Sequence, residues 1–185
     1  MKFISVLSLP IVILIAFNSY NINYLVFGSG YKEGYKGLMY IIWTILPLGY
    51  NYILGHVLIS INKQKYCAVS LSIASVINII LNYLLIPKYS FTGTCIALLI
   101  TEIIIFIFYA YYVEKFLGSL NIAGLAFKLL SIIFVLFGVF YLLTTISVNL
   151  YLVSVILLGL SAILLIKTRV LDYSSFKEIV LAKNI

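Results

Sequence analysis

The sequence predicts an all-α membrane protein, and composition, patterning and length support that prediction. Of its 185 residues, 64% are hydrophobic and only 9% are charged, and the mean hydropathy is +1.21. An average soluble domain is about half apolar and about a quarter charged, so this chain has too little polar surface to cover a globule in water. Its apolar residues form six windows, and six spans of about 20 residues would take up most of the chain. We therefore expect a six-transmembrane-helix bundle.

The expected helices lie at approximately 3–17, 37–61, 66–86, 91–113, 127–146 and 149–166. The first window contains Pro10 and could pass for a signal peptide, but no small-x-small cleavage pattern follows it, which favours a short or truncated spanning helix. Pro87 is expected to end the third helix. The stretch 28–31, which is rich in glycine, is expected to form a turn at the membrane surface.

Orientation follows from the positive charges, which are retained on the cytoplasmic side during insertion. With both termini inside the cell, nine Lys and Arg lie on the cytoplasmic side and three, Lys32, Lys36 and Lys88, lie outside. Six spans satisfy this distribution, whereas five would place the termini on opposite sides. The polar tail 167–185 is expected to lie along the cytoplasmic interface. The formal charge of +7 therefore reports orientation in a cytoplasmic membrane, and no nucleic-acid partner is expected.

Polar side chains at bilayer depth identify the candidate site, because they cost free energy unless they face protein or water. In the 37–61 window, Pro47, Asn51 and Gly55 form one stripe, and Pro47 is expected to kink the helix and provide a hinge. A neighbouring stripe consists of Gly49, Tyr52, His56 and Ser60. Both stripes can also be read as close packing between helices. His56, the only histidine, could donate to an anionic substrate group or could simply pack between helices.

Asn78 and Asn82 lie one turn apart in the third window. Their amides could bind sugar hydroxyls or phosphate oxygens, or could join neighbouring helices. Glu102 is the one acidic residue deep within an expected span, so it should be paired, wet or protonated. A coupling or gating role and a structural hydrogen bond are both open for this carboxyl group.

Several classes of function are disfavoured. The chain has one histidine, no paired carboxylates within a span and no Gly-rich phosphate loop, so we expect no enzyme, no catalytic residues and no cofactor. Cys67 and Cys95 have no metal-ligand or CxxC spacing, so no metal site or disulfide is indicated.

Three segments, in order along the chain, are similar to the motifs of one known family. Residues 25–34, LVFGSGYKEG, resemble its FG-x-x-Y-x-x-a loop. Residues 77–94, INIILNYLLIPKYSFTGT, resemble its N-x-x-L-N-x-x-L-I-P-x-y-G-x-x-G-a segment, and 97–102, ALLITE, resemble the a-t-l-i-T/a-E stretch that follows. The family that these segments resemble is the polysaccharide-biosynthesis flippases, which export O-antigen and capsule repeat units. The chain departs from the pattern at Ser90, where the family usually has Gly, at Thr94, where it usually has Ala, and in its short first helix.

The resemblance implies the C-terminal half of a MATE-like flippase of the multidrug/oligosaccharidyl-lipid/polysaccharide superfamily. Such a protein moves an undecaprenyl-diphosphate-linked oligosaccharide across the bacterial cytoplasmic membrane by rocking two bundles around a polar cavity. The candidates for lining that cavity are Asn51, His56, Asn78 and Asn82, and those for coupling or gating are Glu102 and Pro47. Because a cavity needs a facing bundle, we expect a missing N-terminal six-helix bundle or a second copy as partner. Met1 before a shortened helix favours an internal start or a truncated gene.

Other functions stay open. The bundle could be a non-transporting scaffold subunit of polysaccharide export, or a drug or cation antiporter of the same superfamily. A membrane-bound glycosyl or acyl transferase is disfavoured by the missing acid-base residues.

Overall fold

The computed structural model describes residues 2–31, 33–118, 122–145 and 150–167. Every secondary-structure element in these residues is helical, which confirms the all-α class. The elements are α1 (Lys2–Phe17), α2 (Ser19–Phe27), the 3-10 turn η1 (Ser29–Tyr31), α3 (Gly34–Ile41), the 3-10 turn η2 (Ile42–Thr44), α4 (Ile45–Ser60), α5 (Gln64–Tyr89), α6 (Phe91–Leu117), α7 (Ile122–Thr145) and α8 (Leu150–Lys167). Apart from Lys167, the expected interfacial tail lies outside the described residues.

Three helical segments of the described residues are long and apolar enough to cross a membrane. They are the continuous unit Gly34–Ser60, formed by α3, η2 and α4, together with α5 and α6. The chain also bends by 73° between Ser8–Phe17 and Ser19–Phe27, so α1 and α2 could form a fourth, broken span. Within α7, the stretch Ser131–Leu142 is a shorter apolar helix.

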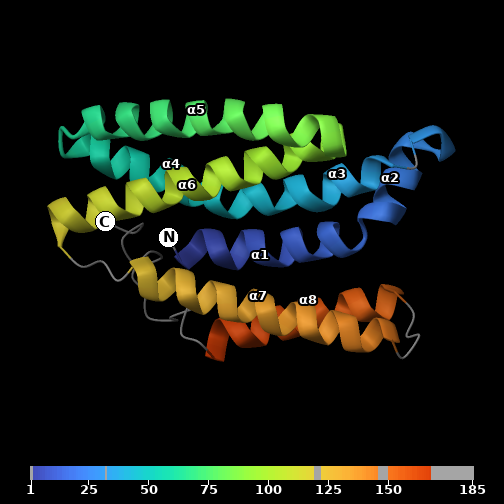
Figure 1. Ribbon diagram of the computed structural model, residues 1–185. Helices are drawn as coiled ribbons and strands as arrows, with labels where there is room; N and C mark the ends of the chain where they lie inside the picture. The colour runs from blue at the N-terminus through green and yellow to red at the C-terminus, as the bar shows by residue number, and fades with distance from the viewer. Residues whose placement is uncertain (1, 32, 119–121, 146–149, 168–185) are drawn as a thin grey trace.

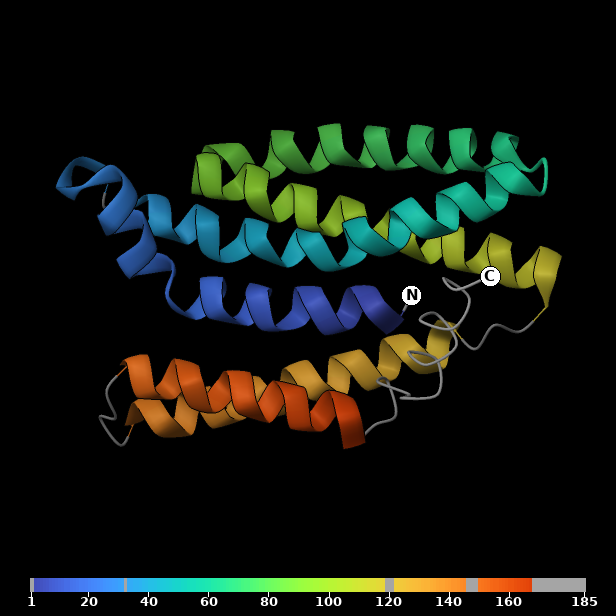
Figure 2. The ribbon, with the colours of Figure 1, turned by 180° about the vertical axis from the view of Figure 1, so that it is seen from behind.

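The helices run roughly along one direction and their connections fall at two ends (Figures 1 and 2). α5, α6 and the α3–α4 unit lie together on one side, α7 and α8 form a hairpin on the other, and α1 lies between them. η1 and the α5–α6 turn share one end, which we call the η1 end. The α4–α5 turn and the start of α1 lie at the opposite end.

Two apolar cores hold this arrangement together. One joins α1 to the start of α4 and to the α7–α8 hairpin, through residues such as Leu9, Ile13 and Leu136. The other joins the second half of α4 to α5 and α6, through residues such as Leu54 and Val113. α6 therefore packs against both α4 and α5.

Several boundaries differ from the sequence prediction. The prediction that Pro87 ends the third helix was wrong, because α5 continues to Tyr89. The residue that caps it is Ser90, which has a φ of 52°. Residues 19–27 were expected outside any helix but form α2. The 37–61 window is interrupted by η2, one turn before Pro47. That is the turn whose carbonyl loses its partner, since proline has no N–H to donate.

α5 is the most exposed of the long apolar helices. Only 11% of its most apolar window is buried within the chain. Large apolar side chains such as Val76, Ile79, Ile80 and Leu84 are exposed along it. A face of this size is far more apolar than a soluble monomer leaves in water.

Candidate functional site

The polar residues at mid-helix depth form a connected group across α4, α5 and α6. We call this group the polar seam, and it consists of Asn51, Asn78, Asn82, Thr101 and Glu102. α6 is its centre, because consecutive residues of α6 bond to different neighbours. Thr101 bonds to α5 and Glu102 bonds to α4.

The α4 side of the polar seam is a double contact. Asn51 donates from Nδ2 to the backbone carbonyl of Glu102 at 2.9 Å and to its Oε2 at 2.8 Å. Asn51 is only 7% exposed, so this amide is the local partner of the acidic group near the middle of α6. Asn51 Oδ1 is buried and has no hydrogen-bond partner among the residues that the structure describes.

The α5 side is a chain of hydrogen bonds. Asn78 donates from Nδ2 to Thr101 Oγ1 at 2.8 Å, and Thr101 donates in turn to the carbonyl of Ala97 at 2.7 Å. Asn82 donates to both the backbone carbonyl and Oδ1 of Asn78, each at 2.9 Å. Asn82 Oδ1 is also buried, and no described residue is its hydrogen-bond partner. Asn78 and Asn82 therefore share one face of α5, as their spacing predicts, and they also bond to each other.

Small residues bring these three helices close enough for the polar seam to form. The buried residues of α5 are Cys67, Ser70 and Ala74, which precede Asn78 on the same face. On α4, a Cβ placed at Gly55 would lie 3.2 Å from the ring of Tyr109 on α6. Small residues at such contacts are typical of helix packing in membranes, where backbones approach closely.

The other predicted site residues lie apart from the polar seam. His56 is exposed and meets the ring of Tyr52 edge-on, with 4.4 Å between the ring centroids. Pro47 is half-buried near the start of α4. The two stripes predicted on this helix thus separate: Asn51 and Gly55 face inward, while Tyr52 and His56 face outward.

Thr101 is the member of the polar seam that sequence reasoning did not single out. Its signal was a hydroxyl residue directly before the glutamate of an apolar helix, within the ALLITE segment. In a helix, adjacent residues point about 100° apart, so such a pair can reach two different neighbouring helices. Among the described residues, no group of three His, Cys, Asp or Glu side chains could hold a metal ion.

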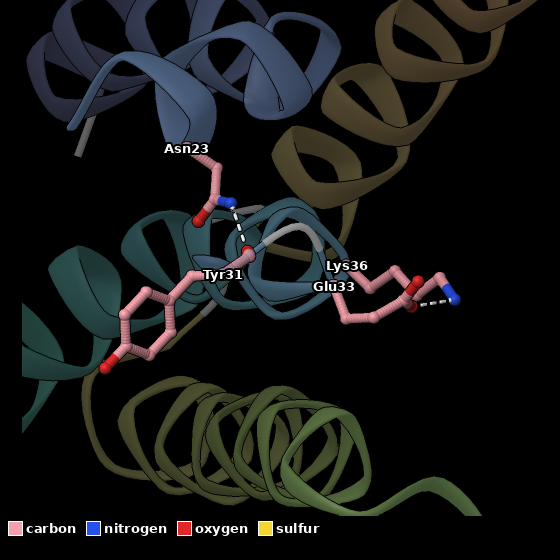
Figure 3. Close-up of polar contacts among 4 residues, drawn as sticks. All are labelled: Asn23, Tyr31, Glu33 and Lys36. Atoms are coloured by element: carbon pink, nitrogen blue, oxygen red, sulfur yellow. Dashed lines mark hydrogen bonds and ion pairs between the residues drawn. The ribbon is translucent and has the colours of Figure 1, made fainter. Parts of the chain in front are cut away.

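A second polar group lies at the η1 end (Figure 3). Asn23 on α2 donates from Nδ2 to the carbonyl of Tyr31 at 2.7 Å, which fixes η1 against α2. Glu33 and Lys36 form an ion pair beside it. A Cβ at Gly34 would lie 2.7 Å from Asn23 Oδ1, so only glycine fits there without a shift.

Comparisons with protein-family models, with curated proteins and with solved structures found no match for this chain. The flippase resemblance therefore rests on the three sequence segments, and two of them, 77–94 and 97–102, contain all of the polar seam except Asn51.

The unpaired acceptors determine what the polar seam offers a ligand. Asn51 Oδ1 and Asn82 Oδ1 can each accept a hydrogen bond from a hydroxyl group or from water. An unsatisfied buried carbonyl costs about 1–3 kcal/mol, and a donor brought by a ligand would recover part of that cost. Sugar hydroxyls are donors of this kind.

Proposed function

We propose that this chain is one six-helix half of a transporter that moves a lipid-linked oligosaccharide, an undecaprenyl-diphosphate-linked repeat unit, across the bacterial cytoplasmic membrane in surface polysaccharide biosynthesis. The observation that carries the proposal is the polar seam, with two buried amide acceptors left open at mid-helix depth. Packing between helices needs hydrogen bonds that are satisfied, whereas a binding surface needs groups that a substrate can satisfy.

Six spans in this proposal are α1, the α3–α4 unit, α5, α6, α7 and α8, arranged as a MATE-like C-terminal bundle with both termini in the cytoplasm. The length and apolar character of the α3–α4 unit, α5 and α6 support it. So does the separation of the helix connections to two ends (Figure 1).

A cavity in this proposal requires a facing bundle, which is an N-terminal half or a second copy of the chain. The outward face of α4 supports that requirement, because Tyr52 and His56 offer polar tips there instead of purely aliphatic ones. Lipid would cover the remaining exposed faces, including the apolar side of α5.

Substrate protection of introduced cysteines tests the proposal. In a Cys67→Ala, Cys95→Ala background, a single cysteine would replace Ser75, which is exposed one turn before Asn78. The matched control is Ile80→Cys, because residue 80 is also exposed but lies on the opposite side of α5. Reaction with a membrane-permeant maleimide is compared in membranes that contain or lack the lipid-linked repeat unit.

We expect the repeat unit to slow labelling at position 75 and to leave position 80 unchanged. A scaffold subunit would show no protection at either position. A drug or cation antiporter would show protection at position 75 by a lipophilic cation and none by the lipid-linked sugar. Either of the last two results would overturn the proposed substrate.

A further inference from the structure

α2 has the opposite polarity from a helix on a water-soluble surface. Its buried residues are Ser19 and Asn23, both polar. Its aromatic residues Tyr20, Tyr24 and Phe27 are each more than half exposed. The spacing i, i+4, i+7 places these three rings along one side. A helix in water would bury the rings and expose the amide, so the medium outside α2 must accept aromatic groups.

The direction of α2 is the second observation. α2 departs from the axis of α1 by 73°. Transmembrane helices tilt on average by about 20° from the bilayer normal. If α1 crosses the membrane with a tilt up to that value, α2 lies closer to the plane of the membrane than to its normal.

The chemistry around α2 sets the depth at which it lies. Ser19–Phe27 contains no charged residue, whereas the ion pair of Glu33 and Lys36 follows directly after η1 (Figure 3). Lys88, in the last turn of α5, also lies at the η1 end. The uncharged aromatic helix thus lies beside charged groups, as at a membrane–water interface, where tyrosine is enriched.

We propose that α2 is an interfacial helix whose aromatic side, formed by Tyr20, Tyr24 and Phe27, binds phospholipid at the boundary between headgroups and acyl chains. This inference rests on the membrane placement in the proposed function and adds an attachment point that transport itself does not require. Asn23 holds the helix in place from the inner side, because its bond to the Tyr31 carbonyl ties α2 to η1. The aromatic rings therefore face lipid at a fixed depth at the η1 end of the bundle.

Tryptophan depth measurements test this inference. Trp43 is the single tryptophan, so a Trp43→Phe background is free of tryptophan fluorescence. Tyr24→Trp places the probe on the aromatic side of α2, at a position that is 57% exposed. Val76→Trp is the matched control, exposed halfway along α5. Each variant is reconstituted in phosphatidylcholine vesicles and quenched by lipids brominated near the headgroup or near the chain end, and by aqueous iodide.

We expect the probe at position 24 to lie about 5–10 Å into the boundary, quenched more by shallow than by deep bromine and shielded from iodide. The probe at position 76 should lie deeper. Quenching at position 24 by iodide alone would put α2 in water, and no quenching by any of the three agents would mean that protein covers it. Both results would overturn this inference and leave the proposed function standing. Failure of bromine to quench position 76 as well would overturn the membrane placement and the inference together.

Discussion

Ser90 determines where α5 turns into α6. Its φ of 52° and ψ of −137° lie in a region that side chains rarely enter, and it stands where the resembling family usually has glycine. Ser90 therefore adopts a backbone conformation that is strained for serine and unstrained for glycine.

Ser90→Gly should stabilise the protein by about 1 kcal/mol, because glycine adopts this conformation without a Cβ clash. The measurement is unfolding by sodium dodecyl sulfate, followed by circular dichroism. Asn62→Gly is the matched control, since Asn62 also has a positive φ, of 59°. Asparagine enters the left-handed region more readily, so its replacement should gain less. Equal gains, or a loss at Ser90, would contradict the assignment of strain to this residue.

Asn51 and Glu102 should be energetically coupled. Asn51→Leu removes both hydrogen bonds, and Glu102→Leu removes the bond to Oε2 but keeps the one to the backbone carbonyl. Either variant loses the side-chain bond, so the two losses of unfolding free energy should not add. We expect a coupling free energy of about 0.5–1.5 kcal/mol between them, as measured for hydrogen bonds inside membranes. The measurement is a double-mutant cycle on unfolding in detergent.

The control cycle pairs Asn51→Leu with Ser72→Ala. Ser72 is exposed on α5 and bonds only to the carbonyl of its own helix at Ala68. Those two losses should be additive. Additivity of Asn51 with Glu102 as well would mean that the α4 side of the polar seam does not stabilise the fold.

At the scale of elements, the α5–α6 hairpin depends on close backbone approach. A Cβ at Gly93 would lie 2.6 Å from the carbonyl oxygen of Leu85, which cannot move aside as a side chain would. The hairpin also carries four of the five members of the polar seam, Asn78 and Asn82 on α5 and Thr101 and Glu102 on α6. Any shift of α6 along α5 would separate Asn78 from Thr101.

Gly93→Ala should therefore destabilise the protein by about 1–3 kcal/mol, as overpacking does. Gly138→Ala is a control of opposite sign. Gly138 lies inside α7 with no described atom within 4 Å of an added Cβ. Alanine there should raise the free energy of unfolding by at most about 1 kcal/mol, because its helix propensity is higher than that of glycine. Both changes are read by the same detergent unfolding. A neutral Gly93→Ala would show that the hairpin tolerates a wider spacing.

The helices themselves could be predicted because apolar windows are a local signal. The start and end of α8, and the existence of α7, follow closely from the windows 149–166 and 127–146. α2 could not be predicted in this way, since its nine residues are too few and too polar to form an apolar window. Its buried Asn23 bonds to Tyr31 of η1, a contact that no local pattern predicts. The extension of α5 past Pro87 was also missed, because a proline in the last turn removes only one bond and the helix can close two residues later.

At the scale of the whole molecule, the two ends of the bundle should lie on opposite sides of the membrane. Ser29 and Asn62 are both exposed, and they flank the continuous unit Gly34–Ser60. A helix of that length extends about 40 Å, which is enough to cross the apolar core of a bilayer.

Single cysteines at these positions, in the Cys67→Ala, Cys95→Ala background, test the orientation. An impermeant maleimide added to intact spheroplasts should label Ser29→Cys, and it should label Asn62→Cys only after the membrane is permeabilised. The positive charges predict this direction. The reverse labelling pattern would mean that the protein has the opposite orientation. Labelling of both cysteines in intact spheroplasts would argue against a span between residues 29 and 62.

Composition and apolar periodicity by themselves determined that this protein is helical, roughly where its helices lie, and which polar residues sit at mid-helix depth. These properties depend on each residue and its near neighbours along the chain. Only the tertiary structure decided that Asn51 pairs with Glu102, 51 residues away, that Thr101 joins α5 to α6, and that His56 faces outward. The physical reason is that hydrogen-bond partners and exposed faces depend on how helices rotate and approach one another, and small residues such as Gly55 and Gly93 set that approach.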